Sequence, residues 1–242
     1  MRNLLAKKQN RFYHDYKVIL AAGSAAGIGV AALPPVQEAM DEPLKTKIIS
    51  ELADVMRPDA ILATNTSTIS ITRLAEAVVG PERFAGFHFF NPVDRMPLVE
   101  VIRGERTSDA TVATLVAHAK KLGKTPIVVK DGPGFLVNRI LFPYLNEALI
   151  LLEEGVDPRA LDRAAEAFGM PMGPITLSDV VGLDTMLFAA DVLHRAYADR
   201  SVRSSVLPLL VAGGRLGKKS GAGFYNYEKN SRGADDPQLN SF

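Results

Sequence analysis

The 242-residue sequence contains no cysteine. A disulfide framework and catalysis by a thiolate are therefore excluded. An excess of charge of one sign is also missing, because 28 lysine and arginine residues stand against 27 aspartate and glutamate residues. Nucleic acids and anionic membranes are consequently not expected as partners. No apolar run reaches the roughly 18 residues that a membrane-spanning helix requires.

The N-terminal stretch is basic and polar over residues 1–16, unlike the apolar core of a secretory signal. Together with the missing membrane span, this predicts a cytoplasmic protein. We predict no metal site. The hydrophobic fraction of 47% is enough to bury one large core or two modest ones.

Strand and helix patterns alternate as far as about residue 130. Short apolar strands are predicted at residues 17–22, 60–64, 84–90, 98–102 and 125–129. Helices are predicted at residues 43–56, 70–79 and 108–122. Ser70 and Ser108 are suitable N-caps for the last two. The alternation predicts an α/β fold with a parallel, doubly wound sheet of the Rossmann type.

The pattern changes at the segment DGPG, residues 131–134, after which only helices are predicted. They cover residues 135–153, 157–169 and 183–197. We therefore expect an α/β domain followed by an all-α domain, and a polar tail. The expected bounds are 1–131 for the truncated dinucleotide-binding domain, 132–228 for the helical domain and 229–242 for the tail.

The motif FAGFHFFNP, residues 84–92, places a histidine near the end of an apolar strand. In open α/β sheets, ligands bind at the carboxyl ends of the strands. His88 could accept a proton there near neutral pH. Glu100, in the next predicted strand, could orient the ring and stabilise the imidazolium. A core histidine beside an edge-strand glutamate would show the same spacing, and spacing alone favours that plainer interpretation.

Two further segments carry polar side chains at expected ligand positions. Ser67 lies in ATNTST, residues 63–68, directly after a predicted strand. Asn138 falls near the first turn of the long helix, where its amide could bind a substrate oxygen. Taken alone, each segment is better explained as an ordinary turn and helix entry.

Together, these segments resemble the 3-hydroxyacyl-CoA dehydrogenase family, in order and without large gaps. The resemblance runs from about residue 38 to residue 227 and is carried by NTSTISI, FAGFHFFNPVDRMPLVEVI, KDGPGFLVNRILFPYLNEA, GMPMGPITLSDVVGLDT and GKKSGAGFYNY. It implies a two-domain enzyme that oxidises L-3-hydroxyacyl-CoA to 3-oxoacyl-CoA and reduces NAD.

The resemblance also implies roles for individual residues. The position of His88 is the general base, and that of Glu100 orients it. The positions of Ser67 and Asn138 contact the substrate, with Ser67 also near the nicotinamide. The remaining positions contact the cofactor, and they are Glu42, Lys47, Asn91 and Lys219.

The sequence departs from the family on its N-terminal side. The G-x-G-x-x-G loop expected in a dinucleotide-binding domain is missing. About twenty residues separate Ala22 from Pro43, and a parallel crossover alone needs a dozen or more. The usual first half of the domain therefore cannot fit, and the grip on the cofactor's pyrophosphate is expected to be lacking.

Residues 23–29, GSAAGIG, offer one substitute, because their spacing is similar to the nucleotide loop of short-chain dehydrogenases. Pro34 would stop the helix that such a loop needs, so a rearranged N-terminus is the simpler interpretation. Membership of that class is rejected. Its Tyr-x-x-x-Lys pair, matched here by Tyr13 and Lys17, would precede the loop instead of following it.

Two functional hypotheses remain. The first is an NAD-dependent dehydrogenase acting on acyl-CoA. The second is a truncated remnant, or a non-catalytic acyl-CoA-binding or oligomerising protein, without the pyrophosphate grip. The tail EKNSRGADDP looks like that of the multifunctional fatty-acid oxidation subunit. The expected partners are an acyl-CoA substrate and either a second copy of the chain or a larger fatty-acid oxidation complex.

Overall fold

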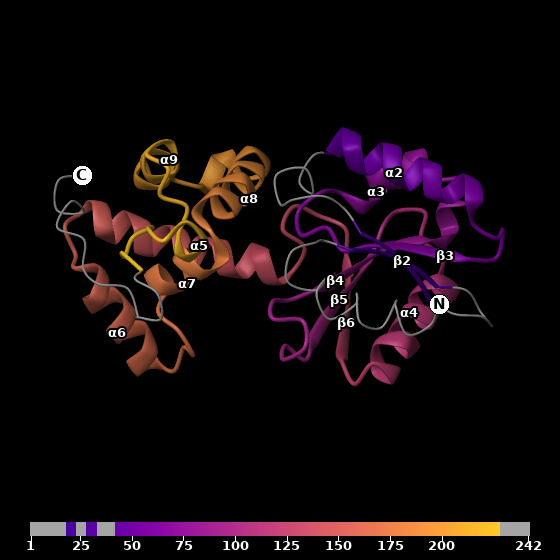
Figure 1. Ribbon diagram of the computed structural model, residues 1–242, viewed down its shortest axis with the longest axis horizontal. Coiled ribbons are helices and arrows are strands. Elements are labelled where there is room, and N and C mark those ends of the chain that lie inside the picture. The colour runs from indigo at the N-terminus through magenta and orange to yellow at the C-terminus, as the bar shows by residue number, and fades with distance from the viewer. Residues whose placement is uncertain (1–17, 23–27, 33–41, 228–242) are drawn as a thin grey trace. The chain divides into compact units, whose positions relative to one another are not determined.

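A mixed six-stranded β-sheet forms the centre of the first of two units (Figure 1). The computed structural model describes residues 18–22, 28–32 and 42–227. The chain divides into Met1–Phe135, here the α/β unit, and Leu136–Phe242, here the helical unit. The predicted tail at 229–242 and the pair Tyr13 and Lys17 lie outside the described residues.

The strands of the α/β unit follow the order β2-β1-β3-β4-β5-β6. Their bounds are β1 Val18–Ala22, β2 Ile28–Ala32, β3 Ile61–Thr64, β4 Phe84–Phe89, β5 Leu98–Arg103 and β6 Thr125–Lys130. The α/β class is confirmed, and the four strands β3 to β6 lie close to their predicted bounds. The strand β2 was not predicted.

The prediction of a parallel sheet is wrong in detail. The pairs β3–β4 and β5–β6 are parallel, whereas β1–β2, β1–β3 and β4–β5 are antiparallel. The physical reason is the length of the connections. Only residues 23–27 join β1 to β2, and residues 90–97 join β4 to β5 without a helix. A parallel crossover needs a longer connection, usually helical, so these strands reverse direction instead.

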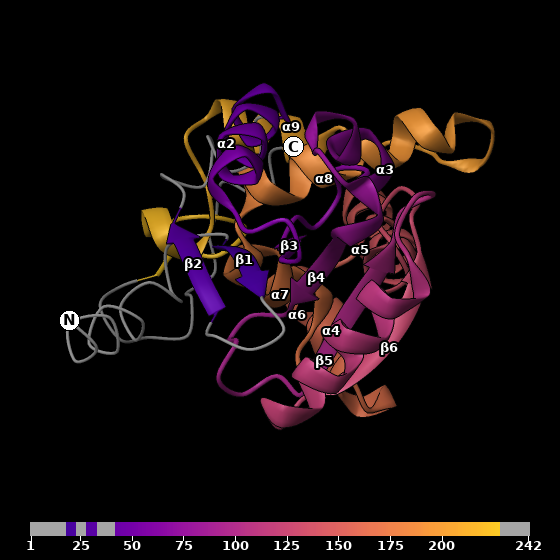
Figure 2. The same cartoon turned by 90° about the vertical axis from the view of Figure 1, so that its right-hand side faces the viewer.

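Helices cover both faces of this sheet (Figures 1 and 2). On one face, α2 (Glu42–Val55) and α3 (Ile71–Leu74) pack over Leu62, Phe84 and Ile102. On the other face, α4 (Asp109–Lys121) covers a second core that includes Phe87, Val99 and Val101. Alternate residues of β4 and β5 thus enter different cores, as the period of two in a strand requires.

The predicted helix caps are present. Ser108 accepts a hydrogen bond from the backbone N–H of Thr111, and Ser70 accepts one from that of Arg73. The helix after Ser70 is shorter than predicted. It ends at Leu74 and continues as one 3-10 turn, η2 (Ala75–Ala77); a separate 3-10 turn, η3 (Pro81–Arg83), follows after an extended residue.

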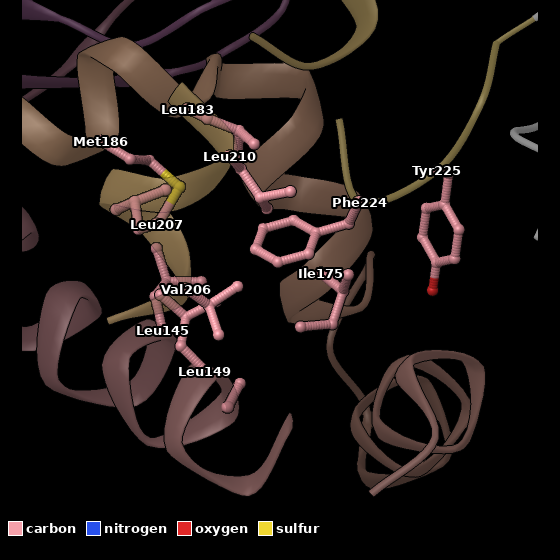
Figure 3. Close-up of a cluster of buried hydrophobic side chains, with 11 residues drawn as sticks. Leu145, Leu149, Ile175, Leu183, Met186, Val206, Leu207, Leu210, Phe224 and Tyr225 are labelled. Carbon is pink, nitrogen blue, oxygen red and sulfur yellow. The ribbon is translucent and has the colours of Figure 1, made fainter. Parts of the chain in front are cut away.

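The helical unit packs its helices around one apolar core. Figure 3 shows Phe224 in that core with Ile175 and Leu210. None of the helices in the described ranges has the length and apolar character needed to cross a bilayer. The helices are α5 Val137–Glu153, α6 Pro158–Phe168, α7 Pro174–Val181, α8 Leu183–Ala196 and α9 Val206–Ala212, with 3-10 turns η4 Ala198–Arg200 and η5 Lys218–Ser220.

Two buried aspartates tie the helical unit to its C-terminal segment. Asp162 accepts hydrogen bonds from the backbone N–H of Ile175, from Thr176 and from the hydroxyl of Tyr225. Asp179, which is 0% exposed, accepts from the backbone N–H of Phe224 and Tyr225. Burial raises the pKa of Asp179, and the hydrogen bonds that it accepts oppose that shift.

The replacement Asp179→Asn is expected to destabilise the helical unit by about 2–4 kcal/mol. Both carboxylate oxygens of Asp179 accept from N–H or O–H donors, so an amide NH2 would face donors at one position. Chemical denaturation followed by circular dichroism measures the change. Asp191→Asn is the control, because it breaks only a surface pair with Arg203. Equal stability of the two variants would contradict the prediction.

Candidate active site

The candidate site is built on the antiparallel pair β4–β5. The register sets His88 directly opposite Glu100. Nδ1 of His88 lies 2.7 Å from Oε2 of Glu100. Both side chains are buried, with His88 5% and Glu100 0% exposed. The two residues predicted as a pair are therefore in contact, because adjacent strands hold them on the same face of the sheet.

The contact bears on which ring nitrogen carries hydrogen. An ionised carboxylate can only accept, so with Glu100 in that form Nδ1 of His88 is the donor. In the neutral ring, Nε2 is then the basic nitrogen. Two aromatic rings border the imidazole in edge-to-face orientation. They are Phe90, with ring centroids 4.7 Å apart, and Phe135, with centroids 5.9 Å apart.

The loop after β3 is tied to the strand that bears His88. The side-chain oxygen of Asn65 accepts a hydrogen bond of 2.9 Å from the backbone N–H of Phe89. Within the loop, the hydroxyl of Thr66 accepts from the backbone N–H of Ile69. Ser67, half-buried, lies between these two anchors. The predicted Ser67 segment is thus held beside the C-terminal end of β4.

The far end of this loop is held by Asp131. Its Oδ2 accepts from the hydroxyl of Ser70 at 2.7 Å and from the backbone N–H of Thr72 at 2.8 Å. Asp131 follows β6, 61 positions beyond Ser70 in the sequence. Its other carboxylate oxygen is buried, with no hydrogen-bond partner among the described residues. Asp131 was predicted only as part of the domain boundary and of a resembling segment, since no local pattern indicates so distant a contact.

The predicted cofactor residues of the α/β unit are more exposed than His88 and Glu100. Glu42, at the start of α2, forms an ion pair with Arg73. Hydrogen bonding and the charge of Glu42 raise the pKa of Arg73. Lys47 is exposed on the same helix, and Asn91 is exposed just after β4. Glu42 thus already has a protein partner, which a cofactor contact would have to share.

The remaining predicted residues belong to the helical unit. Asn138 lies in the first turn of α5 and is half-buried. Lys219, in η5, donates to Oδ2 of Asp184 at 2.6 Å. Asp184 stands in the first turn of α8. Asn138 and Lys219 therefore both lie in regular helical segments of the helical unit.

The two sides of β3 differ in what they offer a dinucleotide. On one side, the polar loop that contains Ser67 is hydrogen-bonded through Asn65 to the strand that bears His88. On the other side of β3, β1 and β2 form an antiparallel hairpin where a phosphate loop and helix would be needed. Ile28 and Gly29 belong to β2, so the helix required by a short-chain-type loop is replaced by a strand, and residues 23–27 lie outside the described residues.

Comparison with known families gives two adjoining matches. Residues 25–132 match the family described as "3-hydroxyacyl-CoA dehydrogenase, NAD binding domain". Residues 134–227 match "3-hydroxyacyl-CoA dehydrogenase, C-terminal domain". NAD is therefore the cofactor of the matched domain. The first match begins earlier than the resemblance noted from about residue 38.

Individual relatives agree with these matches. The chain is 53% identical over 192 residues to a fatty acid oxidation complex subunit alpha of Psychrobacter arcticus, covering 78% of this chain and 27% of that protein. It is 50% identical over 217 residues to the corresponding subunit of Pseudomonas putida, covering 88% and 30%. The chain thus spans less than a third of the length of these curated relatives.

A solved structure of (S)-3-hydroxybutyryl-CoA dehydrogenase from Ralstonia eutropha matches with a TM-score of 0.74 and 46% sequence identity. The match covers 78% of this chain and 68% of that one. Sequence and fold therefore agree over both units, and the chain belongs to the 3-hydroxyacyl-CoA dehydrogenase family.

Proposed function

We propose that this chain carries out the NAD-dependent oxidation of L-3-hydroxyacyl-CoA to 3-oxoacyl-CoA, with His88 as general base. The buried contact of 2.7 Å between His88 and Glu100 is the observation that carries the proposal. Such a contact fixes both the orientation and the tautomer of the ring, which a general base requires. A histidine that only filled the core would not need an ionisable partner.

The proposed chemistry follows from the two ends of the imidazole. Nε2 of His88 takes the proton of the substrate's 3-hydroxyl, while Glu100 holds Nδ1–H and stabilises the imidazolium that forms. When bound, NAD supplies the acceptor for the hydride that leaves C3. The surrounding Phe90 and Phe135 rings exclude water, which strengthens the attraction between the imidazolium and Glu100.

The other family positions complete the proposal. Ser67 and Asn138 would hold the substrate, and Ser67 would also lie near the nicotinamide. The hydrogen bonds of Asn65 and Asp131 fix both ends of the Ser67 loop, which supports a binding role for that loop. Contacts to the cofactor are proposed for Glu42, Lys47, Asn91 and Lys219.

The relatives suggest the cellular setting. Several are named as alpha subunits of a fatty acid oxidation complex. We therefore propose that the chain acts in fatty-acid β-oxidation in the cytoplasm, on acyl-CoA substrates. It would do so within such a complex or as a homodimer.

A second candidate function is favoured by the hairpin β1–β2. This hairpin occupies the side of β3 where a phosphate loop would be expected. A chain with that arrangement could bind acyl-CoA, or oligomerise, while holding NAD too weakly for turnover. Measurement of cofactor binding separates the two candidates.

His88→Gln is expected to lower turnover by about 100-fold or more, because loss of a general base costs about that much. The acyl-CoA affinity should change little, since glutamine retains a polar side chain of similar size. Reduction of acetoacetyl-CoA by NADH measures both quantities. His118→Gln, on the opposite face of the sheet, is the matched control. Turnover in His88→Gln equal to that of the control would remove His88 from the mechanism.

Glu100→Gln is expected to lower turnover by about tenfold or more. The amide could still hold the ring, but it would lack the charge that stabilises the imidazolium. The same assay measures the effect, with Glu105→Gln, an exposed residue beyond β5, as the control. A variant as active as the wild type would leave Glu100 with a packing role only.

NAD binding is expected to be about 100-fold or more weaker than in a family member with an intact phosphate loop. Each hydrogen bond to a charged group contributes about 1.5–3 kcal/mol, and the loss of two would have this effect. Isothermal titration with NAD, and separately with acetoacetyl-CoA, measures the affinities. Tight NAD binding would contradict the prediction and direct attention to residues 23–29 as the phosphate contact.

A further inference from the structure

Phe135 has a backbone conformation that its side chain does not favour. Its φ of 49° lies in the left-handed region, and among the described residues it is the only one other than glycine that does so. This region is uncommon for bulky residues, and such outliers persist where the surrounding structure requires them. Glycine would adopt the same conformation without difficulty. The aromatic ring of Phe135 must therefore serve a purpose that outweighs the strain.

The ring of Phe135 is buried against the candidate base. It is 5% exposed, and its centroid lies 5.9 Å from that of the His88 ring at an interplanar angle of 61°. Phe90 also contacts the imidazole, with an interplanar angle of 62°. Together with Glu100 at Nδ1, the two rings restrict rotation of the imidazole about its bond to the chain.

Polar contacts hold the segment that presents this ring. Asp131 donates its backbone N–H to the carbonyl of Arg103, and its carboxylate binds Ser70 and the backbone of Thr72. Four residues later, the backbone N–H of Phe135 donates to the carbonyl of Gly132 at 2.9 Å. Residues 131–135 thus form a tight turn. Its first residue, Asp131, binds Ser70 at the end of the Ser67 loop, and its last residue, Phe135, contacts the imidazole.

We propose that Phe135 is a positioning residue, which fixes the ring plane of His88 so that Nε2 points toward the substrate's hydroxyl. The inference rests on the proposed role of His88 as base. It assigns a function to Phe135, the last residue of the turn, at a position where glycine would adopt the positive φ with less strain. Loss of the ring should then affect the chemical step more than substrate binding.

Phe135→Leu is expected to lower kcat by about tenfold or more, because a small misplacement of a catalytic group is costly. The KM for acetoacetyl-CoA, measured at saturating NADH, should change by less than about threefold. Phe84→Leu is the matched control, since Phe84 is a buried ring of the same core and lies four positions before His88 on β4. Both variants lose core packing, but only Phe135→Leu should lose kcat.

Nitrogen NMR of histidine-labelled protein gives a readout that needs no turnover. The His88 signals are assigned by their loss in His88→Gln. They should indicate a single Nδ1–H tautomer in the wild type and in the control Phe84→Leu. In Phe135→Leu the imidazole should rotate away from Glu100 part of the time, so its signals should shift toward averaged tautomer values. If the wild type is inactive but Phe135→Leu still shows this shift relative to it, the proposed function is rejected and the positioning role is retained.

The inference is overturned if folded Phe135→Leu keeps both its kcat and the wild-type His88 spectrum. Phe135→Gly is the second variant, because it removes the ring and also relieves the backbone strain. If neither variant folds while Phe84→Leu does, Phe135 is a structural residue and the positioning role is rejected.

Discussion

The register between β4 and β5 is the constraint on which the α/β unit depends. Successive residues in these strands point to opposite faces, so His88 and Glu100 share one face with Ile102, while Phe87 and Val101 enter the other core. A shift of one residue would carry Glu100 to the wrong face and expose apolar side chains at the same time. Packing of both cores therefore also keeps the proposed catalytic pair together.

Close packing around this register requires a residue without a side chain at position 86. A Cβ on Gly86 would lie 2.8 Å from the side chain of Ile102, its neighbour across the strands. Ile102 also contacts the core that includes Ile71 and Phe135. The same apolar cluster thus connects the sheet, the helix after the Ser67 loop and the ring that borders His88. Phe135 is the member of that cluster whose ring borders His88.

Local chemistry in the sequence was sufficient to predict much of the fold. Ser108 caps α4 and Asp157 caps α6, whose end is marked by Gly169 in the left-handed conformation. The contact of His88 with Glu100 also agrees with the prediction, because both lie on adjacent strands with a short connection. These features depend on neighbours in the sequence or in the next element.

Features that depend on distant partners were not predictable in the same way. The direction of β1 relative to β3 is one such feature, because the two strands are not consecutive in the chain and apolar alternation is the same in either direction. The link from Asp131 to Ser70 spans 61 positions. The positive φ of Phe135 could not be predicted either, because the sequence would place such a conformation at the neighbouring Gly134. Tertiary contacts decide all of these.

The buried aspartates of the helical unit have a consequence for the order in which that unit folds during synthesis. One donor to Asp162 is the hydroxyl of Tyr225, which is synthesised 63 positions later. The donors to Asp179 include the backbone N–H of Phe224 and the hydroxyl of Tyr227. Until the ribosome has released that segment, Asp179 lacks the donors that make its burial tolerable, and Asp162 lacks the one from Tyr225. The helices can form early, but their core cannot close around these side chains. The helical unit is therefore expected to remain open, and accessible to chaperones, until its last strand-like segment emerges.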